Sequence, residues 1–268
     1  MGKRIIIYMF LVVLAFIVLF PFFWMVITSF KPLGMGLSMA IIPKNPTLEN
    51  FKLVLTQYRF DRYFINSLVV AILGATFSSL FAILAAYAFA KRRFFFKNGL
   101  FLLFLSAMMV PGMMFMIPQF VLVARLGWIN TYRAMVVPHL ANVFGLFLLT
   151  QFIRQIPSSL IEASRIDGAS EIGVIRRVVL PLSMPIVATV FLLSFQFHWN
   201  NFLWQLIVTT KENMYTVPVG LAMFRSAYEE LYTLRMAASS ISIFPIAILF
   251  LFTQRYFIRG LTEGAIKG

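Results

Sequence analysis

Long apolar runs alternate with short polar segments along this 268-residue chain. A helix that crosses the hydrocarbon core of a bilayer needs about 20 mainly apolar residues. Lipid offers no partners for backbone N–H and C=O groups, so spans of this kind must be helical. We therefore expect an all-α integral membrane protein with a single transmembrane domain over 1–268. Its six transmembrane helices are expected at roughly 5–30, 64–90, 98–121, 133–153, 181–209 and 236–257.

The composition excludes a water-soluble protein. Apolar residues make up 61% of the chain and charged residues only 12%, whereas soluble domains contain roughly 45–50% apolar residues. Cysteine is absent, which excludes disulfides and thiolate metal sites. A net charge of +14 would indicate nucleic acid as the partner of a soluble protein. Here the basic residues flank apolar runs, so we expect contacts with membrane lipid and no nucleic acid.

The positions of the basic residues predict the orientation. Tight clusters beside helix ends lie on one face: Lys3, Arg4, Lys91, Arg92, Arg93, Lys97, Arg154, Arg165, Arg176, Arg177, Arg255, Arg259 and Lys267. The opposite face holds fewer clusters, and half of its basic residues are spread through the 31–63 loop. Because basic loops face the cytoplasm, both termini and the segment 154–180 are predicted to be cytoplasmic.

One polar segment, 157–181, interrupts the apolar pattern between the fourth and fifth spans. Pro157 ends the fourth span, and Ser159 with Glu162 three residues later forms a capping-box pattern. A short helix is expected from there to about Asp167, followed by a turn at Gly168. A second amphipathic piece is expected to continue to Leu180-Pro181. The residues alone leave two interpretations open: a protruding knob that docks a partner, or an ordinary amphipathic interfacial loop.

The spacing within this segment resembles the EAA loop of permease subunits in binding-protein-dependent ABC importers. That pattern is Glu-Ala-Ala, three residues, Gly, nine residues and Ile-x-Leu-Pro. This chain has Glu162-Ala163-Ser164, Gly168 and Val178-Val179-Leu180-Pro181. Ser164 and Val178 depart from the pattern by small changes of side chain. The resemblance implies a coupling helix pair that docks on an ATPase subunit through Glu162, Ala163, Ser164, Asp167, Gly168, Ala169, Leu180 and Pro181.

Further strings over nearly the whole chain resemble the MalG-like permeases of carbohydrate importers. They are Asn66-Ser67-Leu68, Tyr87-Ala88-Phe89-Ala90, Ile117-Pro118-Gln119, Leu126–Thr131 and Gln254–Ala265. This resemblance implies import of a sugar or oligosaccharide across the cytoplasmic (inner) membrane. It also implies three partners: a second permease subunit of different sequence, a dimeric ATP-binding subunit and an extracytoplasmic sugar-binding protein.

The chain lacks a G-x-x-x-x-G-K-[ST] loop and therefore cannot hold ATP phosphates itself. We expect no enzyme activity, no catalytic residue, and no cofactor or metal in this chain, with ATP and Mg bound by the partner ATPase. The fifth span contains polar and aromatic side chains suited to a sugar path: Gln196, Trp199, Asn200, Asn201 and Trp204, with Asn142 in the fourth span. They are equally suited to hydrogen bonds between helices or to an interfacial aromatic belt.

Three alternatives remain at this stage. The EAA pattern alone does not separate a sugar permease from one for peptides, phosphate or amino acids. An ion-coupled secondary transporter is less consistent, because all nine acidic residues fall in loops or near span ends. An intramembrane enzyme is not supported, since the chain contains neither the H-E-x-x-H nor the G-x-S-x-G motif.

The polar tail 260–268 is either a frayed end or a segment that reaches between the ATPase subunits.

Overall fold

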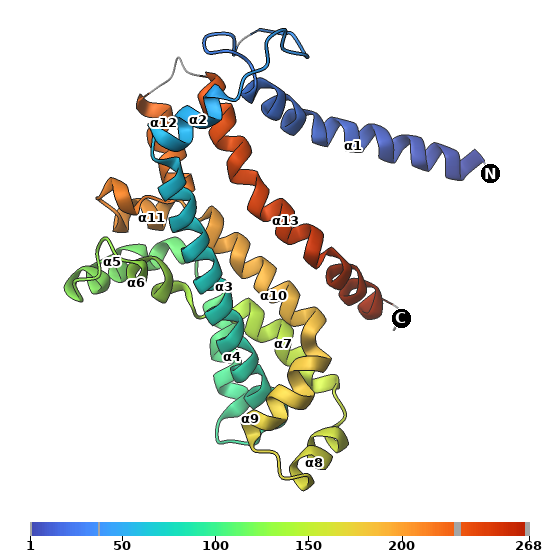
Figure 1. Ribbon diagram of the computed structural model, residues 1–268. Helices are drawn as coiled ribbons and strands as arrows, with labels where there is room; N and C mark the ends of the chain where they lie inside the picture. Colours follow the sequence, from blue (N-terminus) through green and yellow to red (C-terminus); the bar gives the residue numbers. More distant parts are fainter. Residues whose placement is uncertain (1, 37, 228–231, 266–268) are drawn as a thin grey trace. The chain divides into compact units, whose positions relative to one another are not determined.

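Figure 1 shows the computed structural model, which describes residues 2–36, 38–227 and 232–265 and the side chains of 4–36, 38–223 and 232–254. Every regular element within these ranges is a helix. This confirms the all-α fold class that the apolar pattern predicts. The tail expected at 260–268 lies outside the described side chains, and 266–268 lie outside the described residues altogether.

Four helices are long and apolar enough to cross a membrane: 4–29, 60–91, 171–200 and 232–254. Two further candidates are bent helix pairs, 97–107 with 112–125 at 93° and 132–139 with 143–155 at 47°. Within the described residues the number of spans is therefore four, or up to six if each bent pair is one span. The six predicted spans correspond to these four helices and two pairs.

The chain divides into two compact units, residues 1–65 with 216–245 and residues 66–215 with 246–268. The first unit contains α1 (Gly2–Ser29), α2 (Glu49–Thr56), the first turns of α3 (Phe60–Lys91), α12 (Val217–Ala227) and the first part of α13 (Tyr232–Ala265). None of the apolar window of α1 is buried, and its apolar side chains from Ile5 to Phe23 are exposed. Such a surface is suited to lipid.

The end of α1 is closed by a side chain of α2. The buried Asn50 side chain donates 2.7 Å hydrogen bonds to the carbonyls of both Ser29 and Lys31. Lys31 is itself 1% exposed; its Nζ donates to Ser38 O at 2.6 Å and lies 4.3 Å from the centre of the Trp24 ring. Carbonyls at a helix end have no partner within the helix, so the Asn50 side chain supplies the donor that the backbone lacks, while Lys31 holds the following loop at Ser38.

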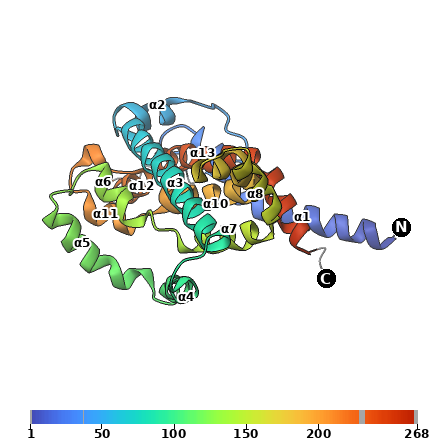
Figure 2. The same ribbon diagram turned by 90° about the horizontal axis from the view of Figure 1, so that it is seen from below.

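The second unit contains the rest of α3 and the elements between it and α12. They are α4 (Lys97–Ala107), η1 (Gly112–Phe115), α5 (Met116–Arg125), α6 (Tyr132–Val136), η2 (Val137–His139), α7 (Val143–Gln155), α8 (Ser158–Ile166), α9 (Glu171–Val174), η3 (Ile175–Val179), α10 (Leu180–Asn200), α11 (Leu203–Val208) and η4 (Glu212–Met214). Figures 1 and 2 show α3, α7 and α10 side by side, with α8 and α9 at one end of them.

Two apolar cores hold this unit together. One joins α3, α4, α7, α8 and α10 through residues such as Ala86, Leu149 and Val190, and it includes Ile161 of α8. The other joins α3, α5, α6 and α11 around Met135 and Trp204. α3 approaches α10 very closely, because a Cβ atom at Gly74 would overlap the His198 ring. The polar segment that contains α8 is thus packed onto the spans and does not hang free.

Three spans differ from their expected course where the backbone breaks. Pro111, at φ −57° and ψ 124°, separates α4 from η1 and α5 within the expected 98–121 span. Proline has no N–H to donate and disfavours helical geometry in the residue before it, so the chain turns there. The fourth span breaks between His139 and Val143, and the fifth ends at Asn200 because Asn201 is extended.

Replacing Asn50 by alanine should lower the stability of the protein in detergent. The change leaves the carbonyls of Ser29, the last residue of α1, and of Lys31 without their donor, which costs about 1–3 kcal/mol for buried groups. A fall in Tm of several degrees, followed by intrinsic tryptophan fluorescence, is expected. Asn45→Ala, an exposed asparagine in the loop before α2, is the matched control. Equal Tm values for the two variants would contradict the role of Asn50.

Candidate functional site

The first feature of the polar segment is the short amphipathic helix α8. Ile161 is 2% exposed and packs into the core of the spans, whereas Glu162 and Ile166 on other faces are exposed. The predicted capping box is wrong: the N-cap residue is Pro157, and no side chain caps the helix. Pro157, with ψ 131°, is not helical and separates the preceding span from α8. The helix begins at the next residue, Ser158, so Ser159 lies inside it.

The helix ends in a Schellman turn at Gly168. The N–H of Gly168 donates to the Arg165 carbonyl and that of Ala169 to the Ser164 carbonyl, both at 3.0 Å. This pair of bonds requires a left-handed residue between them, and Gly168 has φ +80°. The predicted turn at Gly168 is therefore confirmed. The turn separates Asp167, the C-cap of α8, from Ser170, the N-cap of the next helix.

The second piece does not end at Leu180-Pro181 as expected. Ser170 accepts a 3.2 Å hydrogen bond from the Gly173 N–H and starts a helix that continues from Glu171 to Asn200. One π-helical turn, η3, precedes Pro181, and the Leu180 N–H donates to Ile175. A wider turn at this point accommodates a proline that has no N–H for the regular helical bond. The fifth span and the second piece are consequently one continuous helix.

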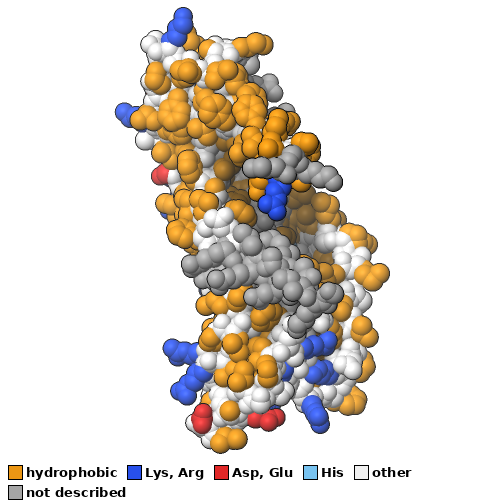
Figure 3. All heavy atoms as spheres, turned by 90° about the vertical axis from the view of Figure 1, so that its right-hand side faces the viewer, with side chains coloured by type: hydrophobic (Ala, Val, Ile, Leu, Met, Phe, Trp, Pro, Cys, Tyr) orange, Lys and Arg blue, Asp and Glu red, His pale blue; other side chains and the backbone are white. Residues whose placement is uncertain are grey.

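The docking residues predicted from the pattern lie on the accessible side of this segment. Glu162, Ala163, Asp167 and Gly168 are exposed, and Ser164 and Ala169 are half-buried. The Glu162 carboxylate makes no hydrogen bond or ion pair with any other residue that the structure describes. On the face drawn in Figure 3, charged side chains gather at the lower end, which α8 and α9 form in Figure 1. Leu180 and Pro181 lie apart from this face, inside the long helix.

Glu171 joins this segment to the end of α3. Its carboxylate accepts hydrogen bonds from Tyr87 at 2.5 Å, from Arg92 at 2.9 Å and from Arg165 of α8 at 3.0 Å. Arg165 also donates to the Tyr87 hydroxyl at 3.2 Å. The hydrogen bonds to Glu171 and Tyr87 raise the pKa of Arg165 above its ordinary value, so the guanidinium stays charged. These three contacts fix the position of α8 relative to the second span.

A second contact from α3 holds the chain just before α8. Lys91 Nζ donates to the carbonyls of Arg154 at 3.1 Å and Ile156 at 2.5 Å. Both carbonyls belong to the end of α7, where backbone acceptors have no intrahelical donors. A cation there also interacts favourably with the helix dipole. The chain is therefore held to α3 both before and after α8.

Sequence reasoning missed the roles of Glu171, Tyr87 and Lys91. The sequence pattern indicates only a topological role for Lys91 and assigns no role to Tyr87. The one available signal was a tyrosine and a lysine four residues apart at the end of an apolar run, which places both on one helix face. Their partners are 63 to 84 residues away in the chain, and no local pattern identifies them.

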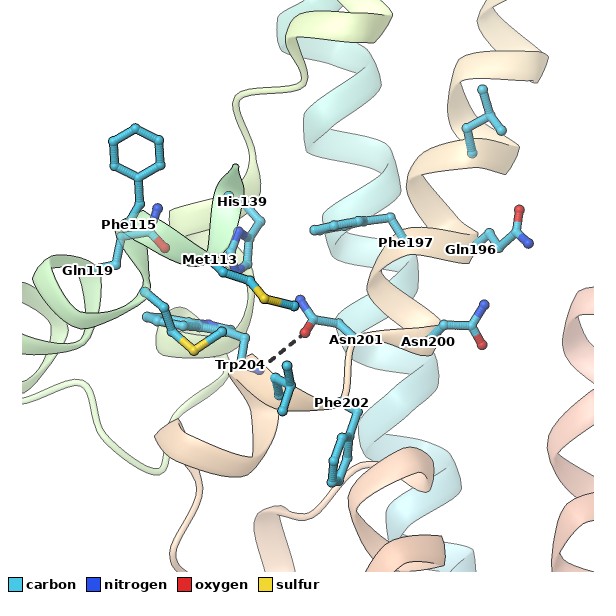
Figure 4. Close-up of a pocket in the computed structure, with 14 residues that line it drawn as sticks. Met113, Phe115, Gln119, His139, Gln196, Phe197, Asn200, Asn201, Phe202 and Trp204 are labelled. Atoms are coloured by element: carbon cyan, nitrogen blue, oxygen red, sulfur yellow. Dashed lines mark hydrogen bonds between the residues drawn. The ribbon is translucent and has the colours of Figure 1, made fainter. Parts of the chain in front are cut away.

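A cavity of about 820 Å³ lies at the opposite end of this unit, between the end of α10, α11, η2 and the η1–α5 segment. Four of the six residues expected to line a path contribute to it: Gln196, Asn200, Asn201 and Trp204. Figure 4 shows His139, Phe197, Asn201 and Trp204 facing one another, while Gln196 and Asn200 point to the other side of α10. The lining is mainly apolar and aromatic with a few amides, which is typical of small-molecule sites.

The other two expected path residues lie in helix packing. Trp199 is 2% exposed and stacks on Phe195, with ring centres 5.8 Å apart. Asn142 caps α7 by accepting from the Gly145 N–H at 2.7 Å, and it donates to Ser194 of α10 at 2.9 Å. Asn142 thus connects two helices. In the part of the chain that the structure describes, no group of three or more His, Asp or Glu side chains could hold a metal ion.

Comparison with known proteins places this geometry in context. A family model described as the inner membrane component of binding-protein-dependent transport systems matches residues 78–263. The arabinooligosaccharides transport system permease protein AraQ of Halalkalibacterium halodurans is 37% identical over 95% of this chain and 93% of its own length. The trehalose/maltose transport system permease protein MalG of Thermococcus litoralis is 36% identical over 99% of this chain and 98% of its own.

The same fold is found among solved structures. A chain of a bacterial ABC transporter involved in the import of the acidic polysaccharide alginate superposes with a TM-score of 0.84. The match covers 95% of this chain and 96% of that one at 23% sequence identity. The arrangement of helices described above is therefore one that a protein of known structure also adopts.

Proposed function

The chain belongs to the family of inner membrane components of binding-protein-dependent transport systems, and from this premise we propose that it passes a sugar or oligosaccharide through the membrane. It is a permease subunit of an ABC importer, without catalytic activity of its own, and it works with an ATPase subunit and a binding protein. The relatives named for arabinooligosaccharides and for trehalose and maltose support a carbohydrate substrate. The observation that carries the proposal is α8, a helix with an exposed, unpaired Glu162 between two spans.

α8 is the element on which the ATPase docks. Glu162 offers a free carboxylate for a charge-assisted contact, and Ala163 offers little side-chain bulk, so another surface can come close. The Schellman turn at Gly168 and the continuous helix from Glu171 make the segment rigid. Force on α8 therefore reaches the spans without being absorbed by a flexible linker. ATP and Mg bind to the dimeric ATPase partner, and closure of that dimer moves α8.

The complete translocator also needs a second permease subunit, of different sequence. The exposed apolar surfaces of this chain, of which α1 is the longest, are covered by lipid and by that subunit. Both termini and α8 face the cytoplasm, where the ATPase lies, because the basic residues beside α8 and the end of α3 follow the positive-inside rule. The binding protein then delivers the sugar on the opposite side of the membrane.

The cavity beside α10 is the sugar path within this subunit. Sugars are bound by amide groups for their hydroxyls and by aromatic faces for their C–H surfaces, and both are present there. Gln196 and Asn200 are four residues apart and expose their amides on one face of α10, on the side of the helix away from Phe197, whereas Asn201 places its amide among the aromatic rings. Trp204 is held in place by its indole N–H, which donates to the Ala134 carbonyl at 2.8 Å.

ATP hydrolysis by the reconstituted complex tests the proposal most directly. A sugar-loaded binding protein should stimulate hydrolysis, and Gly168→Val should abolish both this stimulation and uptake while membrane insertion persists. A β-branched residue at φ +80° is strained by about 1–2 kcal/mol or more, so the turn that closes α8 would be lost. Uptake driven by an ion gradient without any ATPase would overturn the assignment.

Glu162→Lys should weaken copurification of the ATPase with this chain. The substitution reverses the charge of the exposed carboxylate and leaves every described contact of α8 with the spans unchanged. Glu49→Lys, an exposed carboxylate in the first turn of α2, is the matched control and should retain the ATPase. If the Glu162 variant retains the ATPase at the level of the control, Glu162 has no docking role.

Asn200→Ala should raise the KM for sugar uptake about fivefold with little change in maximal rate. Loss of one hydrogen bond to a sugar hydroxyl is worth roughly 1 kcal/mol, which corresponds to that factor. Asn98→Ala, an exposed asparagine at the start of α4, is the control. Identical KM values for the wild type and both variants would show that this part of α10 does not contact the sugar.

A further inference from the structure

We propose that Glu171 and Tyr87 are positioning residues that transmit the displacement of α8 to α3, so that three spans move with the docking helix. The inference rests on the proposed docking of an ATPase on α8. Two spans are joined to α8 through the backbone: α7 precedes it, and the continuous helix 171–200 follows it. α3 has no such connection and is linked to α8 only through side chains.

The contacts after α8 come together on one carboxylate. Tyr87 and Arg92 reach Glu171 from α3 and the residue after its end, at 2.5 and 2.9 Å, and Arg165 reaches it from α8 at 3.0 Å. Arg165 Nη2 also contacts the second carboxylate oxygen at 3.4 Å and the Tyr87 hydroxyl at 3.2 Å. Tyr87, Glu171 and Arg165 therefore each contact the other two, so a shift of Arg165 acts on both Glu171 and Tyr87.

The contact before α8 strengthens this link. Tyr87 and Lys91 are four residues apart on the last turns of α3 and therefore lie on the same helix face. Tyr87 contacts Glu171, shortly after α8, and Lys91 contacts the Ile156 carbonyl, just before α8. α8 is thus held to one face of α3 at both of its ends, which resists rotation as well as translation.

α3 is also well suited to carry such a displacement along its length. Tyr87 is 3% exposed and packs in the core with Ala86 and Ile83 of the same helix. Farther along, Gly74 lies so close to the His198 ring that α3 and α10 interlock. α3 runs unbroken from Phe60 to Lys91. A rigid, closely packed helix transmits a push on one end to the other.

The carboxylate is not placed there for stability alone. The Glu171 side chain is 42% exposed and those of Arg92 and Arg165 are 49% and 36% exposed. Ion pairs in such positions are worth about 0–1 kcal/mol. The Tyr87 hydroxyl adds direction to them, because it approaches from the buried side and fixes the orientation of the carboxylate. The contacts therefore serve mainly to fix the position of Glu171 relative to α3 and α8.

The test compares Tyr87→Phe, Glu171→Gln and the double variant in complexes with ATPase and binding protein. Tyr87→Phe keeps the buried ring and removes only the hydroxyl. In each variant the ATPase should copurify as in the wild type and hydrolyse ATP, while the sugar imported per ATP falls about fivefold, on the scale of one lost hydrogen bond. The double variant should be no worse than the poorer single one, because Tyr87→Phe removes the donor and Glu171→Gln weakens the acceptor of the same hydrogen bond. Tyr8→Phe, an exposed tyrosine of α1, is the control.

Wild-type sugar import per ATP in Tyr87→Phe and Glu171→Gln would overturn the inference, as would additive losses in the double variant. Loss of the ATPase from these variants would also overturn it, because Glu171 would then act in docking. Failure of the proposed function is recognised separately, by retention of the ATPase in Glu162→Lys or by uptake without ATP.

A direct measurement of motion uses the absence of native cysteine. Spin labels on cysteines introduced at Phe95, 97% exposed just after α3, and at Ile172, 75% exposed, report the distance between the two elements. This distance should stay constant between the nucleotide-free and ATP-bound complexes, and Tyr87→Phe should broaden its distribution. A distance that changes with ATP in the unsubstituted protein would show that α3 and the docking segment move independently.

Discussion

Backbone hydrogen bonding in a medium without water is the constraint on which the structure depends. Regular helix satisfies it along the spans, and each departure from regular helix needs a substitute partner. Asn142 supplies one where the fourth span breaks, by accepting from the Gly145 N–H. Asn201 supplies another after α10, by accepting from the Trp204 N–H at 3.3 Å. At the end of α7, Lys91 donates to two terminal carbonyls. Polar side chains within apolar spans are thus explained first by the backbone that they satisfy.

The same breaks create the cavity. Irregular backbone at membrane depth is tolerated only where it is buried in protein or lines a polar space. α5, η2 and α11 are short because the chain bends at Pro111, near Pro138 and at Asn201, and these three elements form the walls around His139 and Trp204. The bends cost regular hydrogen bonds, and side-chain contacts such as that of Trp204 with the Ala134 carbonyl offset the cost. A straight six-helix bundle would have no such space on this side of α10.

The sequence predicts the features that depend on local patterns. Hydrophobic length gives the spans, and the left-handed turn at Gly168 follows from a residue without Cβ between two polar pieces. The helix start at Pro157 and the π-helical turn before Pro181 were not predicted, because each depends on how a proline is accommodated by neighbouring turns. The Glu171 contacts could not be predicted either, since they join residues up to 84 positions apart. The assignment of Gln196 and Asn200 to a common face, by contrast, needs only helical periodicity.

Coupling imposes requirements different from those of stability. A charge buried deep among the spans would cost several kcal/mol to desolvate, and a contact that strong would be expensive to rearrange in each transport cycle. The carboxylate of Glu171 lies at the end of the spans and its side chain remains 42% exposed. Its ion pairs are therefore weak and contribute little to the free energy of folding. Its three donors nonetheless come from fixed directions, of which the Tyr87 hydroxyl comes from the buried side. Weak pairs held in a defined geometry allow α8 and α3 to keep their relative position while both move, and this explains why the charged residues cluster at this end of α3.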